Sequence, residues 1–229
     1  MRDRPVVVLF DIDGTLVTCG GAGRRAMERA FDEHTLARST SDFSFGGMTD
    51  RAIVREALRR GERDVDDAIL EATLERYLTH LADELPRSTG YRVLEGVHET
   101  LDGLEREVAR GRRIAIGLGT GNLVRGAELK LRVADLWGRF GFGGFGSDHE
   151  DRARLLDHGR SRGAAELGVS SEDVVTVVIG DTPRDVSAAR AIGARCIAIA
   201  SGSFARDTML DADVTLDSMR EVRLDHLLG

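Results

Sequence analysis

A short apolar run near the start of the chain, Val6–Phe10, follows a proline and stops at two carboxylates, Asp11 and Asp13. A brief run rich in β-branched residues indicates a strand buried on both faces, as in a parallel sheet. Because side chains at i and i+2 of a strand point to the same side, both carboxylates are expected to face one small volume at its carboxyl end. In open α/β sheets that edge is where ligands bind. Two like charges held so close are costly unless a cation lies between them or one is protonated.

Further strand-like runs follow and alternate with helical patterns. Strands are expected at Arg113–Leu118, Val174–Ile179, Cys196–Ala200 and Val214–Leu216. Strand–helix alternation at this spacing predicts an α/β fold with a Rossmann-like, doubly wound parallel sheet. Gly138–Gly146 is dense in glycine and phenylalanine, and one interpretation of it is a close-packed crossing strand.

Between the first strand and the later ones the chain shows only helical patterns. Helices are expected there at Arg24–Leu36, Arg51–Arg60 and Asp67–Glu84. We predict that residues 18–91 form an all-helical cap inserted after the first strand, and that residues 1–17 and 92–229 form the catalytic core. The small-residue stretch Val17–Gly23 and the segment Pro86–Gly96 are interpreted as its two hinges.

Three expected strands end in polar residues, namely Asp11 and Asp13, Thr120, and Asp181 with Asp185. The carboxyl ends of parallel strands meet at one edge of a sheet, so these side chains are expected to form a single site. Their joint occurrence is more specific than any one of the motifs.

The segment Asp11–Leu16, DIDGTL, resembles the first motif of the haloacid dehalogenase superfamily, most of whose members are Mg²⁺-dependent phosphotransferases. The resemblance implies that Asp11 is a nucleophile forming an aspartyl phosphate. It implies that Asp13 is the general acid for the leaving oxygen and then the general base for water. Gly14 is expected to contact the substrate. Taken alone, the motif also fits a turn between strands or a calcium-type acidic loop, with Asp13 as a capping residue.

Gly119–Asn122, GTGN, resembles the second motif of the superfamily. The hydroxyl of Thr120 and the groups of Gly121 and Asn122 are expected to donate to phosphoryl oxygens at a helix N-terminus, which favours anions. Alternatively, Thr120 or Asn122 caps the following helix, and the two interpretations are compatible.

Gly180–Asp185, GDTPRD, resembles the fourth motif. The resemblance implies that Asp181 binds Mg²⁺ directly, because hard cations prefer carboxylate and carbonyl oxygens. Asp185 would contribute through water or hold a ligand in place. An oxygen of Asp11 and the backbone carbonyl of Asp13 would complete the metal site. The alternative for Asp185 is an acid favoured by the dipole at a helix N-terminus.

The third motif is where the chain departs from the superfamily, whose members usually place a lysine there. Of the 32 basic residues only Lys130 is a lysine, and it is expected to lie too far along its helix to reach the site. Arg152 is the best substitute, because arginine offers phosphate a planar fork of donors. Arg154 and His149 are fallbacks, and the alternative for Arg152 is a solvated side chain at a helix start.

Specificity is expected to lie in the cap. Gly46–Arg51, GGMTDR, is similar to the G-x-T-D stretch of phosphoglycolate-phosphatase-like members of the superfamily, which would present Thr49 and Arg51 to the substrate. The competing interpretation, which we favour, is that Thr49 or Asp50 only caps the helix that follows. Arg24 and Arg25 are further candidates to face the cleft.

The net charge of −7 and the absence of a basic block argue against nucleic acid as the main partner. No apolar run approaches the length that spans a membrane, and Arg2–Arg4 lead into the first strand without a signal-peptide pattern. Cys19 and Cys196 show no metal or redox spacing and are expected to stay thiols. We therefore expect a cytoplasmic protein, monomeric or homodimeric, acting on a small phosphorylated metabolite.

These patterns together predict a Mg²⁺-dependent phosphatase that hydrolyses a small phosphate monoester, phosphoglycolate-like or a sugar phosphate, through an aspartyl phosphate. A β-phosphoglucomutase-like phosphomutase would share the same core. A non-catalytic, phosphate-sensing protein is the alternative of a different class, and it gains weight if Arg152 cannot replace the usual lysine.

Overall fold

The computed structural model describes residues 4–34, 43–61, 66–202 and 204–228. Its core is a six-stranded sheet in the order β5-β4-β1-β6-β7-β8, and every pairing in it is parallel. The strands are β1 (Val6–Phe10), β4 (Ile114–Thr120), β5 (Phe142–Phe145), β6 (Val175–Gly180), β7 (Arg195–Ile199) and β8 (Val214–Leu216). The first strand lies inside the sheet and later strands are added on both sides of it. The predicted α/β, Rossmann-like fold is therefore confirmed.

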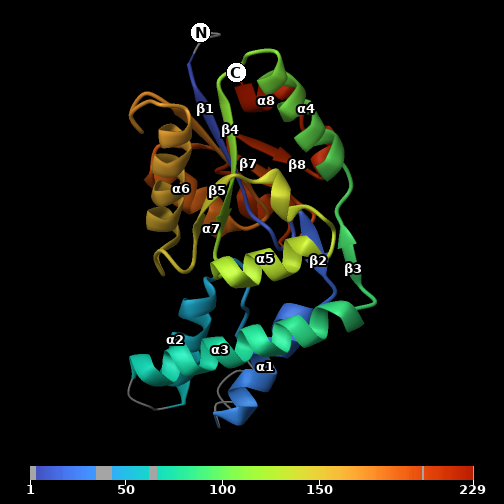
Figure 1. Ribbon diagram of the computed structural model, residues 1–229, viewed down its shortest axis with the longest axis vertical. Helices are drawn as coiled ribbons and strands as arrows, with labels where there is room; N and C mark the ends of the chain where they lie inside the picture. The colour runs from blue at the N-terminus through green and yellow to red at the C-terminus, as the bar shows by residue number, and fades with distance from the viewer. Residues whose placement is uncertain (1–3, 35–42, 62–65, 203, 229) are drawn as a thin grey trace.

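Helices cover both faces of the sheet, which explains why the apolar run of β1 is continuous. Val6, Val8 and Phe10 belong to one apolar cluster and Val7 and Leu9 to another. The first cluster includes residues of α4 (Val97–Ala109), α5 (Val124–Arg132) and α8 (Leu224–Leu228). The second includes residues of α6 (Arg152–Glu166) and α7 (Pro183–Ala191), which lie on the other side of the sheet in Figure 1.

Three helices lie beyond the carboxyl ends of the strands, at the end of the molecule away from both termini (Figure 1). They are α1 (Ala22–Glu33), α2 (Asp50–Arg60) and α3 (Asp67–Glu84). The chain leaves the core through β2 (Val17–Cys19) and returns through β3 (Tyr91–Val93), and these strands pair antiparallel as a short ribbon. The division into core and cap stays a prediction, and its boundaries at residues 18 and 91 fall within this ribbon.

The differences from the expected elements have local causes. Gly138–Gly146 contains the 3₁₀ turn η3 (Trp137–Arg139) and β5, and the strand is glycine-rich because α6 lies directly on it: a Cβ on Gly144 would come within 1.8 Å of the Leu155 carbonyl oxygen. The expected end of the first helix at Leu36 lies outside the described residues. None of the helices in the described part of the chain is long and apolar enough to cross a membrane.

Candidate active site

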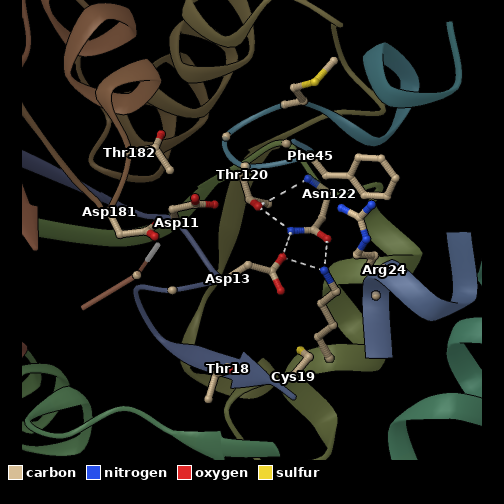
Figure 2. A pocket seen from close by; sticks show the side chains of 18 of the residues that line it. Asp11, Asp13, Thr18, Cys19, Arg24, Phe45, Thr120, Asn122, Asp181 and Thr182 are labelled. Carbon is tan, nitrogen blue, oxygen red and sulfur yellow. Dashed lines mark hydrogen bonds and ion pairs between the residues drawn. The ribbon is translucent and has the colours of Figure 1, made fainter. Parts of the chain in front are cut away.

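The polar residues at the ends of β1, β4 and β6 line one cavity of about 530 Å³ between the edge of the sheet and the helices of residues 22–84. Figure 2 shows Asp11 beside Asp181, with Thr120 and Asn122 across the cavity and Asp13 between the two groups. The predicted convergence of the strand ends on one site is what the structure shows.

Three buried acids could hold a metal ion. Oxygen atoms of Asp11, Asp181 and Asp185 lie within 4.8 Å of one another. Burial, added to repulsion from the other two acids, raises the pKa of Asp181 to about 8. Burial also raises the pKa of Asp11 to about 6, although Arg152 opposes the change. Ionising these acids together is therefore costly, and a cation among them would offset that cost and lower their pKa values.

Gly14 makes room for this cluster. Its φ of +81° is in the left-handed region, and a Cβ at this position would come within 2.2 Å of the Asp181 Oδ2 atom. Only glycine meets both demands at low cost. Three carboxyl groups this closely grouped suit a hard divalent cation such as Mg²⁺.

Arg152 is the cation of this cluster. Its Nη2 atom lies 2.8 Å from Asp11 Oδ2 and 2.5 Å from Asp185 Oδ1, and its side chain is buried. The solvated-arginine alternative is therefore wrong. The fallback residues do not take this position, because Arg154 is exposed and the His149 ring accepts a hydrogen bond from the Asp151 amide.

Asp185 also caps its own helix. Its Oδ2 atom accepts hydrogen bonds from the amide and hydroxyl of Thr182 at 3.0 and 2.7 Å, and the Thr182 hydroxyl accepts from the Asp185 amide in return. The opposite oxygen, Oδ1, meets Arg152. The capping interpretation and the interpretation as a member of the acid cluster are therefore compatible. One carboxylate oxygen accepts hydrogen bonds at the start of α7, and the other binds Arg152 beside Asp11.

The second motif forms a hydrogen-bonded group instead of capping a helix. Asn122 Nδ2 donates to Thr120 Oγ1 at 2.8 Å and to Asp13 Oδ2 at 2.9 Å. The N-cap of α5 is Leu123, whose amide donates to the Asp50 carboxylate at 2.8 Å, so the capping interpretation of Thr120 and Asn122 is wrong.

Gly121 lies where this motif meets the cap. Its carbonyl oxygen accepts from the Asp50 amide at 2.9 Å, and a Cβ here would come within 2.6 Å of the Met48 carbonyl oxygen. The second motif and the start of α2 therefore bind each other through backbone groups and one carboxylate. Burial raises the pKa of that Asp50 carboxyl to about 6, with Lys130 opposing.

Lys130 was expected to lie out of reach, and this expectation is wrong. Its Nζ atom lies 2.5 Å from Asp13 Oδ2 and 2.5 Å from Asn122 Oδ1, and the residue is only 4% exposed. The reason is that α5 crosses the edge of the sheet instead of running back along it (Figure 1). The available signal was the position of this lone lysine on the apolar face of its helix, beside Ala127 and Leu131.

The Lys130 contact changes the electrostatics of Asp13. Enclosure in the cavity acts to raise the pKa of Asp13, but the ammonium group and the Asn122 amide outweigh it and the pKa lies below its usual value. Burial acts to lower the pKa of Lys130, but the Asp13 carboxylate outweighs it and the pKa lies well above its usual value.

Thr49 and Arg51 do not line the cavity. Thr49 is the N-cap of α2, accepting from the Ala52 amide and donating to the Glu150 carbonyl. Arg51 forms an ion pair with Glu71 on α3 at 2.6 Å. The capping interpretation of Thr49 is confirmed, and no contact supports the substrate-binding one.

Other residues of the segment 18–91 do line the cavity, among them Arg24 and, from the predicted specificity stretch, Gly46, Gly47, Met48 and Asp50. The Arg24 guanidinium lies over the Phe45 ring, 4.5 Å from its centroid, as Figure 2 shows. Arg25 pairs with Glu84 instead. Cys19 is a free, buried thiol beside the cavity, and burial raises its pKa to about 12.

Comparison with known proteins shows the family of the chain. Residues 6–193 match the family of haloacid dehalogenase-like hydrolases. The chain is 27% identical to a phosphoglycolate phosphatase of Rhodospirillum rubrum over 210 residues, which cover 86% of this chain and 80% of that protein.

Solved structures share the fold at low sequence identity. A mutant of CbbY from Rhodobacter sphaeroides, in complex with xylulose-(1,5)bisphosphate, has a TM-score of 0.68 at 20% identity, covering 98% of this chain and 99% of that one. A putative β-phosphoglucomutase from Bacteroides vulgatus has a TM-score of 0.66 at 18% identity, and the match covers 96% of this chain and 86% of that one.

The chain belongs to the haloacid dehalogenase-like hydrolase family. It is an enzyme, and its predicted class, a phosphatase of this family, is confirmed at that level by the family match and the curated relative.

Proposed function

We propose that the protein is a Mg²⁺-dependent phosphatase that hydrolyses a small phosphate monoester through an aspartyl phosphate on Asp11. The observation that carries the proposal is the grouping of Asp11 with two further buried acids and Arg152 at the end of β1. A carboxylate nucleophile splits a difficult displacement into two easier steps.

Asp11, Asp181 and Asp185, with the backbone carbonyl of Asp13, would hold the Mg²⁺ ion. A bound Mg²⁺ neutralises charge on the oxygens of the transferred phosphoryl group. Arg152 pairs with the Asp11 carboxylate and is proposed to replace the lysine that superfamily members usually place in the third motif.

Asp13 is the proton-transfer group of the proposal. The protonated form of Asp13 donates its proton to the leaving oxygen while the Asp11 oxygen bonds to phosphorus. The ionised form, which its lowered pKa favours, then removes a proton from the water that attacks the aspartyl phosphate, and this restores the protonated form. Thr120 is proposed to bind a phosphoryl oxygen, since its hydroxyl lies at the end of the neighbouring strand β4. Gly14, Gly121 and Asn122 line the same cavity.

The substrate is proposed to be a small metabolite, phosphoglycolate-like or a sugar phosphate. The cavity of about 530 Å³, the curated phosphoglycolate phosphatase relative and the net charge of −7 support a small anionic ester over nucleic acid or a membrane surface. We further propose a cytoplasmic enzyme that is a monomer or homodimer.

The test is phosphate release from a panel of small monoesters, including phosphoglycolate and sugar phosphates, with Mg²⁺ and with EDTA. Metal-dependent release is expected from wild type, and none above background from Asp11→Asn. Asp83→Asn, an exposed acid on α3, is the matched control and should retain wild-type turnover. Wild-type turnover in Asp11→Asn would remove Asp11 as the nucleophile. Transfer of the phosphoryl group to a second sugar phosphate without release would make the protein a phosphomutase.

A further inference from the structure

Two buried cations divide the acids of the site between them. Arg152 pairs with Asp11 and Asp185, and Lys130 pairs with Asp13. The proposed nucleophile and the proposed proton-transfer group are therefore held by different side chains from different helices, α6 and α5. The role of the second cation is not explained by phosphate binding or by the metal cluster.

Lys130, Asn122 and Asp13 form a closed triangle of hydrogen bonds. Lys130 Nζ donates to Asp13 Oδ2 and to Asn122 Oδ1, each at 2.5 Å, and Asn122 Nδ2 donates to Asp13 Oδ2 at 2.9 Å. The dashed lines around Asp13 and Asn122 in Figure 2 mark these contacts. Both donors bind the same carboxylate oxygen, Oδ2, so neither Lys130 nor Asn122 occupies the Oδ1 atom.

Asp13 needs such restraint more than the other acids do. Its side chain is 46% exposed, whereas Asp11 and Asp181 are buried at the ends of their strands. An aspartate that projects into a cavity from a turn can adopt several rotamers. A general acid works only when its oxygen is within hydrogen-bond reach of the leaving group.

The Lys130 side chain reaches from α5 to the first turn of α1. A Cβ on Gly23 in that turn would lie 3.6 Å from the Lys130 Nζ atom, an ordinary contact distance. The carbonyl oxygen of Lys130 accepts from the Tyr91 hydroxyl at 2.7 Å, which ties this turn of α5 to β3. Among 32 basic residues this is the single lysine, and its ammonium group is a compact point charge.

We propose that Lys130 is a positioning residue that, together with Asn122, fixes the Asp13 carboxylate so that its Oδ1 atom faces the leaving oxygen of the substrate. The inference rests on the proposed function, because it assigns Lys130 a part in the proton transfer of that reaction. It acts through Asp13 and makes no contact with the phosphoryl group.

The test compares kcat/KM for two monoesters that differ in leaving group. The p-nitrophenolate of p-nitrophenyl phosphate departs without a proton, whereas the alkoxide of phosphoglycolate requires one. Because kcat/KM reports the steps up to departure of the leaving group, it isolates the acid role of Asp13 from its later role with water. Lys130→Met should lower kcat/KM for phosphoglycolate, or for the best alkyl ester of the panel, by about 100-fold or more, the usual contribution of a general acid. The loss for p-nitrophenyl phosphate should be less than about tenfold.

A double-variant comparison shows whether Lys130 acts through Asp13. Asp13→Asn should show the same selective loss, and Lys130→Met with Asp13→Asn should be no worse than Asp13→Asn alone, because coupled residues are not additive. Arg132→Met, an exposed position on the same helix, is the control and should retain wild-type kinetics. If Lys130→Met does not fold, Lys130→Gln, which keeps one donor, is measured in the same way.

Equal losses on both esters, or additive losses in the double variant, would overturn the inference and leave the proposed function intact. Failure of wild type to release phosphate from any ester would instead overturn the proposed function. Because the first outcome requires an active wild-type enzyme, the two failures are distinguishable.

Discussion

Replacing Arg152 by methionine removes the buried cation that binds Asp11 and Asp185. Removing one partner of a buried ion pair costs about 3–5 kcal/mol, because the other charges stay buried without compensation. For a chain of this size, 1 kcal/mol corresponds to a shift in Tm of about 2–4 °C. The metal-free variant should therefore melt about 6–20 °C below wild type.

Magnesium should restore part of this loss. Without Arg152 the three grouped carboxylates have no cation beside them, so the rise in Tm on adding Mg²⁺ should be larger in Arg152→Met than in wild type. Turnover should stay about 100- to 1,000-fold below wild type even at saturating Mg²⁺, because a fixed donor beside the reacting group is missing. Differential scanning fluorimetry in EDTA and over a series of Mg²⁺ concentrations measures the change in Tm. Phosphate release from the same samples measures turnover.

The control is Arg154→Met, two residues further along α6, where the side chain is exposed. It should match wild type in Tm and in turnover. Equal Tm of Arg152→Met and wild type in EDTA would refute the claim that this buried pair stabilises the metal-free protein. Equal Mg²⁺-induced shifts would refute the claim that the guanidinium and the metal compensate the same carboxylates.

Three further predictions concern Asp50, Gly14 and Arg51. Burial raises the pKa of Asp50 from 3.8 to about 6 in the folded protein. Between these two pH values the folded state keeps the proton and the unfolded state loses it. The free energy of unfolding of wild type, compared with that of Asp50→Asn, should therefore fall by about 3 kcal/mol as pH rises through this range. Urea unfolding of both proteins across this pH range measures the two free energies of unfolding. A difference between them that does not change with pH would contradict the burial argument. Gly14→Ala should lose about 1–2 kcal/mol of stability because its φ is positive. It should also bind Mg²⁺ more weakly, because the new Cβ would collide with the Asp181 carboxyl group. Calorimetric titration measures the Mg²⁺ affinity, and an affinity equal to that of wild type would contradict this prediction. Arg51→Ala removes only a surface ion pair, so KM for the best ester should stay within about twofold of wild type; a larger rise would return Arg51 to the substrate site.

Much of the fold could be predicted because its signals are local. The apolar runs of β1 and β6 are continuous since both faces of these strands are covered, and α3 begins at Asp67 and ends at Glu84 as its spacing predicted. The capping role of Thr49 was also readable, because it depends on an amide three residues later.

Part of the candidate site could be predicted for a topological reason. Parallel strands end at one edge, so acids placed after β1 and β6 must approach each other whatever the details of packing. The position of Arg152 followed from its place at the start of the helix before β6. Lys130 could not be placed in this way, because its reach depends on the direction in which α5 crosses the sheet.

The sequence by itself determined the buried strands β1 and β6 and the acids at their ends, because those properties depend on neighbours in the chain. It did not show β2 and β3, which lie in the two stretches interpreted as hinges. Only the tertiary structure decided which cation meets which carboxylate: Arg152 with Asp11, and Lys130 with Asp13. It also decided that Arg51 lies outside the cavity, paired with Glu71. The physical reason is that an ion pair forms at a separation of about 3 Å, so the two elements that carry the charges must be placed closely relative to each other. Their placement depends on how α5 and the helices of residues 22–84 pack at the carboxyl edge of the sheet. No pattern of neighbouring residues in the sequence determines that packing.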